Sequence, residues 1–185
     1  MTKKILIAYY SWSNKTKQVA KKLAQALDAE LLELTVKNNV FSTDMYKTSE
    51  IAKTQIKTND FPELVTKIPD ISQYETILVG SPVWNGAPAT PLHSFLAQIA
   101  NFKGKIATFY TDAGSVGAYG EIFKTLIMAA NGQISRLVGE RVLTEPEFAD
   151  VELTLFLRDL NCQIKLEKTT CSFVMYFMNT SSGVL

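Results

Sequence analysis

The sequence predicts an α/β protein in which helices cover both faces of a parallel β-sheet. Its apolar runs are continuous rather than alternating, which is typical of strands that are buried on both faces. Segments with apolar residues at helical spacing follow these runs. No internal repeat and no linker divides the chain. Strands that alternate with helices in this way indicate a parallel sheet with right-handed crossovers.

Five segments are expected to form the strands. The first, Ile5–Tyr9, holds five consecutive apolar residues and then breaks into a polar loop. The third ends at Pro82, and Gly104 is the turn residue before the fourth. The expected strands are residues 5–9, 30–35, 76–81, 105–111 and 135–143.

The helices are expected between these strands. One begins at Thr16, because apolar residues then recur at helical spacing with lysines on the opposite side. The segment 37–70 is polar and irregular, with breakers such as Pro62, and we expect only a short helix at 50–56 within it. Further helices are expected around residues 92–99, 119–130 and 151–164.

The length of 185 residues is that of a single domain with a sizeable core. We expect residues 1–165 to form this domain, and residues 166–185 to be a C-terminal tail of unknown role. Part of the tail, 171–178, is apolar and aromatic, which favours packing on its own domain or on a second copy in a homodimer.

The net charge of +1 argues against a nucleic-acid partner that recognises a basic surface. Cys162 and Cys171 lack metal-site spacing and are expected to be free thiols in a reducing compartment. The sequence shows no secretory signal and no stretch long enough for a membrane span, so we expect a cytoplasmic protein without a membrane partner.

The first of three informative loops joins the strand 5–9 to a helix N-terminus. Free main-chain N–H groups and the helix dipole favour an anion there, and hydroxyl groups add donors. The loop therefore indicates a phosphate site; the alternative is an ordinary helix cap by Ser13 or Asn14 with nothing bound. It lacks the glycines of nucleotide-binding loops of the GxxxxGK[ST] and GxGxxG types. Its residues are Ser11, Trp12, Ser13, Asn14, Lys15 and Thr16.

The second loop, residues 80–91, is stiffened by prolines, and Gly86 permits a tight turn. Trp84 stands in its middle, where it would be a stacking platform for a planar ring or would fold back into the core. The third loop, residues 111–120, contains three glycines that let the main chain approach a ligand, although it could be a plain connection. A planar ring that carries a phosphate, as in flavin mononucleotide (FMN), would satisfy all three loops.

In these loops the chain resembles the flavodoxin-like family, and within it the short-chain bacterial flavodoxin group. That group has the pattern YYS-x-SGNT, then GxPxWxGxxPxPxxxFL, then a T-x-GGS loop. The matching segments are residues 9–16, 80–96 and 111–115, in the same order, and the resemblance covers about residues 3–145. One departure is Asn14-Lys15 in place of Gly-Asn; Asn tolerates a left-handed backbone, and Lys15 adds a charge near the phosphate. The tail has no counterpart in the family.

The resemblance implies a three-layer sandwich around a five-stranded parallel sheet in the order 2-1-3-4-5, with non-covalent FMN. By position, the phosphate would be held by Ser11, Ser13, Asn14, Lys15 and Thr16. The isoalloxazine ring would be lined by Pro82, Val83, Trp84, Asn85 and Gly86, with Trp84 as the stacking ring. Its other side would meet Thr111, Gly114 and Ser115. No metal is implied.

Three functions follow as alternatives. The first is an electron carrier that shuttles electrons through FMN to a redox partner protein and needs no catalytic side chain. The second is an FMN-dependent oxidoreductase of NAD(P)H and quinones; the near-neutral charge favours it, since carriers of this family are usually acidic. The third is a flavin-free binding module. The single histidine, His93, is expected on a helix surface, and no Ser/His/Asp set surrounds it.

Overall fold

The computed structural model describes residues 4–112, 119–130 and 137–142, and it confirms the predicted parallel sheet. The strands are β1 (Ile5–Tyr9), β2 (Glu30–Glu33), β3 (Thr76–Trp84), β4 (Ala87–Pro88), β5 (Lys105–Thr111) and β6 (Leu137–Val142). Five of them form a parallel sheet in the order β2-β1-β3-β5-β6, and β4 pairs antiparallel with the end of β3. Counted without β4, the order is 2-1-3-4-5, as the resemblance implies.

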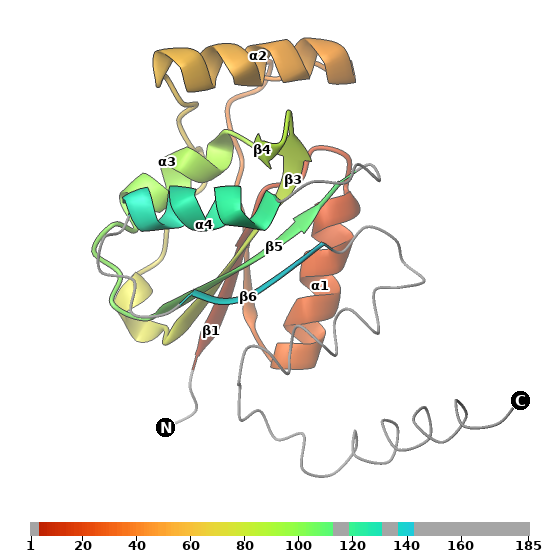
Figure 1. Cartoon of the computed structure of the whole chain (residues 1–185). Helices are drawn as coiled ribbons and strands as arrows, with labels where there is room; N and C mark the ends of the chain where they lie inside the picture. The colour runs from red at the N-terminus through yellow and green to blue at the C-terminus, as the bar shows by residue number, and fades with distance from the viewer. Residues whose placement is uncertain (1–3, 113–118, 131–136, 143–185) are drawn as a thin grey trace, which may run out of the picture.

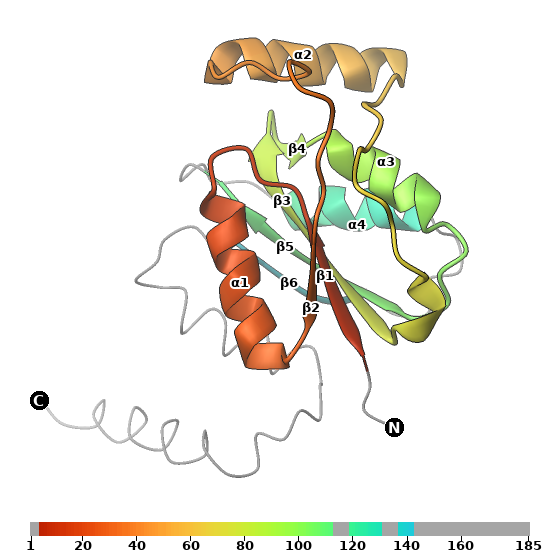
Figure 2. The ribbon, with the colours of Figure 1, turned by 180° about the vertical axis from the view of Figure 1, so that it is seen from behind.

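The helices form layers on the two faces of the sheet (Figures 1 and 2). Helix α1 (Lys15–Leu27) covers one face, and α3 (Pro91–Gln98) and α4 (Tyr119–Ala130) cover the other. Helix α2 (Met45–Thr58) lies beyond the carboxyl end of the sheet, on the side of the β3–β4 hairpin. A 3-10 turn, η1 (Ile71–Gln73), precedes β3. No helix of the described part of the chain is long and apolar enough to cross a membrane.

The strand β1 shows why the apolar runs are continuous. Alternate residues of a strand face opposite sides of its sheet. Ile5 and Ile7 accordingly join the core under α1, whereas Leu6 and Ala8 join the core under α3 and α4. Since both faces are covered, every position of this strand is buried. The same reasoning applies to the buried part of β3 and to β5.

Several predicted boundaries were wrong. Helix α2 is twice as long as the segment 50–56, because the Asp44 side chain accepts a hydrogen bond from the Lys47 N–H group (3.0 Å) and Asn59 ends the helix in a left-handed conformation. Strand β2 ends at Glu33 rather than at residue 35. Strand β3 continues past Pro82, where it pairs with β4 after leaving the sheet. The predicted helix 151–164, the tail and both cysteines lie outside the described residues.

Candidate functional site

The candidate site lies at the carboxyl edge of the sheet, where β1, β3 and β5 end side by side. Adjacent register pairs bring Tyr9 next to Gly80 and Pro82 next to Thr111, so the three loops that follow these strands meet at one edge. Ligands of open parallel sheets bind at such an edge. Of the third loop, Gly114 and Ser115 lie outside the described residues.

The loop before α1 leaves the helix N-terminus open. Asn14 precedes the helix in a left-handed conformation (φ 64°), and its side chain makes no capping hydrogen bond. The Ser11 hydroxyl oxygen instead accepts from the Lys17 N–H group (3.2 Å). Within the described residues no group accepts from the N–H groups of Lys15 and Thr16. Neither Ser13 nor Asn14 makes the expected side-chain capping hydrogen bond within the described residues, and two donors remain for an anion.

A buried hydrogen bond joins the first loop to the end of β5. The hydroxyl oxygens of Thr16 and Thr111 lie 2.8 Å apart, and either can be the donor. Thr16 is 1% exposed and Thr111 is 4% exposed. Residues that the resemblance assigns to opposite ends of the ligand, the phosphate and the ring, are therefore in direct contact.

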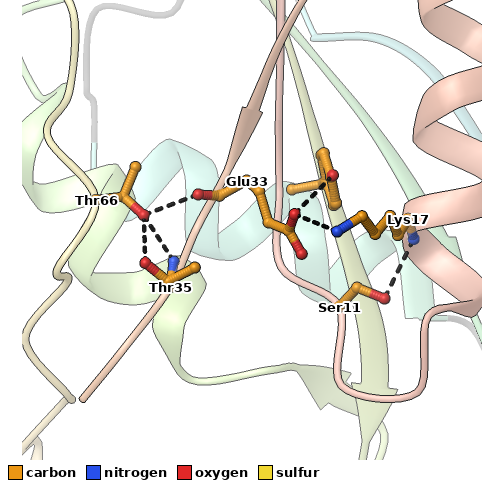
Figure 3. Close-up of polar contacts among 6 residues, drawn as sticks. Ser11, Lys17, Glu33, Thr35 and Thr66 are labelled. Carbon is orange, nitrogen blue, oxygen red and sulfur yellow. Dashed lines mark hydrogen bonds and ion pairs between the residues drawn. The ribbon is translucent and has the colours of Figure 1, made fainter. Parts of the chain in front are cut away.

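Beneath the first loop, a polar cluster fixes α1 against β1 and β2 (Figure 3). The Glu33 carboxylate accepts from the Lys17 ammonium group (2.6 Å) and from the Tyr9 hydroxyl (3.3 Å). Its main-chain carbonyl accepts from the Thr66 hydroxyl (2.8 Å). The pKa of Tyr9 is raised to about 12, first by burial and then by the negative charge of Glu33 and the hydrogen bond from Tyr9 to the Glu33 carboxylate. The Lys17 ammonium group is thus bound to Glu33, whereas Lys15 is exposed at the helix start.

The second loop is a two-residue hairpin. Asn85 (φ 51°) and Gly86 (φ 79°) both have positive φ, as the tight turn between β3 and β4 requires. The Asn85 side chain is bound to Ser49 of α2: its amide donates to the Ser49 carbonyl (2.9 Å) and its oxygen accepts from the Ser49 hydroxyl (2.5 Å). The side chain of Asn85 therefore anchors α2 to the hairpin.

Trp84 is half-buried and belongs to an aromatic cluster at the same edge. Its ring meets Tyr10 edge-on at 5.6 Å and Phe41 at 4.9 Å between centroids. Burial raises the pKa of Tyr10, which keeps its hydroxyl neutral. The cluster packs on the core below α3 and α4. Trp84 thus contacts the core while keeping part of its surface exposed, and its use as a stacking ring stays a prediction.

Sequence reasoning missed the segment that closes the first loop. Phe41 packs on Trp84, and the Ser42 carbonyl accepts from the indole N–H group of Trp12 (3.0 Å). These residues fall in the stretch that was interpreted as irregular. The only signal for this segment in the sequence was the pair Ser42 and Asp44, residue types that favour a helix start. Asp44 caps α2, and the Asp44 N–H group donates to the Ser42 hydroxyl (3.0 Å).

His93 lies on α3 and differs from the expected surface residue. It is half-buried and stacks on Phe61, with ring centroids 4.0 Å apart. Burial lowers its pKa from the ordinary 6.5 to about 4, so the imidazole is neutral at pH 7. No group of three or more His, Cys, Asp or Glu residues in the described part of the chain is arranged to hold a metal ion.

Comparison with known proteins finds flavodoxins and flavoproteins among the matches. A family model with the description Flavodoxin matches residues 4–141. A flavoprotein from Lactobacillus acidophilus NCFM, solved in complex with FMN, is 38% identical, with a TM-score of 0.68 over 81% of this chain and 98% of that chain. The apo-form of the flavoprotein from the same organism is 41% identical, with a TM-score of 0.61 over 81% and 97%. A curated relative from Sinorhizobium fredii, named NAD(P)H dehydrogenase (quinone), is 25% identical over 138 residues; the match covers 74% of this chain but only 63% of that relative.

Proposed function

Because the chain belongs to the flavodoxin family, we propose that it binds FMN non-covalently at the carboxyl edge of its sheet and transfers electrons through it to a redox partner protein. The observation that carries the proposal is the open N-terminus of α1 behind the left-handed Asn14. Two unpaired N–H groups and a positive helix end fit a phosphate monoester. The flavoprotein from Lactobacillus acidophilus, which is solved with FMN, supports this choice of ligand.

The first loop would bind the phosphate. The N–H groups of Lys15 and Thr16 point along the helix axis at its N-terminus, and the exposed Lys15 ammonium group adds a full positive charge. Ser11 would donate its hydroxyl hydrogen while its oxygen accepts from Lys17. Ser13 and Asn14 complete the loop and are exposed to an incoming ligand.

The second and third loops would hold the ring. Pro82 is the last residue of β3 within the parallel sheet, Val83 and Trp84 continue the strand beyond it, and Asn85 and Gly86 turn the chain back. Thr111, Gly114 and Ser115 would complete the other side. Bound flavin supplies the redox chemistry, and the chain's own residues set its position and its access to water. This division of roles needs no catalytic side chain.

The test is a titration of the flavin-free protein with FMN and with riboflavin, followed by flavin fluorescence. We expect strong quenching by FMN and weak quenching by riboflavin, because riboflavin lacks the phosphate. Lys15→Met removes one charge at the helix N-terminus and should weaken FMN binding about two- to fivefold, with no change for riboflavin. Lys21→Met, an exposed lysine on the same helix, is the matched control. Absence of binding to either flavin would reject the proposal and favour a flavin-free module.

A second candidate, an FMN-dependent oxidoreductase of NAD(P)H and quinones, is favoured by the Sinorhizobium fredii relative and by the balanced charge. The two candidates differ in what the flavin-loaded protein does alone. A carrier should oxidise NAD(P)H negligibly without its reductase. An oxidoreductase should lose its flavin absorbance with NAD(P)H and turn over when a quinone is added. The assay therefore needs no knowledge of the partner.

A further inference from the structure

The hydrogen bond between Thr16 and Thr111 leaves one hydroxyl hydrogen without an acceptor. Two hydroxyl groups carry two O–H donors, and their mutual bond of 2.8 Å uses one. Neither hydroxyl has another partner among residues 4–112, 119–130 and 137–142. Both residues are almost fully buried, and a buried donor without an acceptor is costly. The pair is therefore suited to an acceptor that arrives with a ligand.

The direction of this bond decides what Thr16 offers to a ligand. If Thr16 donates to Thr111, the Thr16 oxygen presents only lone pairs, which repel an anion. If Thr111 donates to Thr16, the Thr16 O–H group is left as a donor beside the open N–H groups of α1. A phosphate oxygen only accepts, so it favours the second arrangement, in which each bond polarises the next.

We propose that Thr111 is a positioning residue for phosphate recognition: it donates to the Thr16 hydroxyl oxygen and thereby directs the Thr16 O–H group to the phosphate of the flavin. The inference rests on the proposed FMN site and deepens it. It assigns Thr111 an action through Thr16, whereas the family pattern places Thr111 against the ring. A role at the ring would affect the binding of both FMN and riboflavin, whereas a role at the phosphate would affect FMN alone, because riboflavin has the ring but not the phosphate.

The test compares the FMN and riboflavin affinities of Thr111→Val with those of the wild-type chain. Valine keeps the shape and removes the hydroxyl. We expect FMN binding to weaken about two- to tenfold, the worth of one hydrogen bond, and riboflavin binding to stay unchanged. Thr111→Ser, which restores the hydroxyl, should recover FMN affinity. A Thr16→Val/Thr111→Val double variant should bind FMN no more weakly than Thr16→Val alone, since Thr111 acts only through Thr16.

Thr108→Val is the matched control. Thr108 is a buried threonine on the same strand, and its hydroxyl has no hydrogen-bond partner in the described structure. This variant should leave both affinities unchanged. Equal losses of FMN and riboflavin affinity in Thr111→Val would overturn the inference in favour of a ring contact. Unchanged affinities for both flavins would overturn it as well. Failure of the wild-type protein to prefer FMN would instead reject the proposed function itself. If Thr111→Val does not fold, loss of FMN preference in Thr111→Ala with recovery in Thr111→Ser decides the same question.

Discussion

Replacement of Asn14 by alanine should strain the loop that precedes α1. Asn14 has φ 64° and ψ −6°, in the left-handed region that ordinary L-residues avoid. Its side chain is exposed and makes no capping hydrogen bond. Asn14→Ala therefore removes neither a packed side chain nor a cap, and its effect isolates the cost of the backbone conformation.

The magnitude follows from this conformation. The left-handed region costs L-residues roughly 1–2 kcal/mol, and Asn is among the few that visit it routinely. Asn14→Ala should thus lower the free energy of unfolding of the FMN-saturated protein by about 1 kcal/mol. If the flavin-free loop relaxes to another conformation, the same cost is instead seen in binding, as an affinity about fivefold weaker for FMN. Asn14→Gly removes the strain but adds freedom to the unfolded chain, so its net effect should be near zero.

The assay is urea unfolding at a fixed excess of FMN, because this measures the sum of both contributions. Parallel FMN titrations then divide the sum between stability and affinity. Asn14→Gly is the control, since it differs from Asn14→Ala only by a Cβ atom. Equal stability of Asn14→Ala, Asn14→Gly and the wild type would refute the left-handed geometry, and with it the main evidence that the helix N-terminus is shaped for an anion.

Three further substitutions test other parts of the structure. Gly80→Ala would place a Cβ atom 2.1 Å from the fully buried Phe109 ring, so urea unfolding should show a loss of about 3 kcal/mol, which Phe109→Leu partly relieves. Glu33→Gln should lower the Tyr9 pKa from about 12 while leaving it above 10, because burial persists; ultraviolet titration measures this. His93→Phe should flatten the pH dependence of stability. As the pH falls, His93 of the wild type is protonated in the unfolded state near pH 6.5 but in the folded state only near pH 4. The contribution of neutral His93 to stability is therefore present above pH 6.5 and is lost as the pH falls towards 4.

The sheet could be predicted from sequence because each strand by itself shows a continuous apolar run, which indicates burial on both faces. The run Ile5–Tyr9 needs no partner to be identified, and the same holds for 105–111. Helix α2 was underestimated because its apolar side chains are sparse and it lies beyond the end of the sheet rather than on a face. Its position depends on polar contacts instead, such as Asn85 with Ser49, and these leave no periodic pattern.

In the candidate site, too, local features could be predicted from sequence and long-range contacts could not. A local conformation can be anticipated from residue type: Asn at position 14 was expected to tolerate a left-handed backbone, and φ is 64°. A contact between distant residues cannot. Thr16 and Thr111 each stand in a loop whose small polar residues suggest a ligand, but 95 positions separate them, and only the parallel pairing of β5 with β3 brings Thr111 to the start of α1. Side-chain hydroxyls that meet across three crossovers carry no periodicity and no spacing rule. In the proposed FMN site this bond would connect the phosphate and ring ends of the ligand, so the residue that the family resemblance assigns to the ring would act on the phosphate.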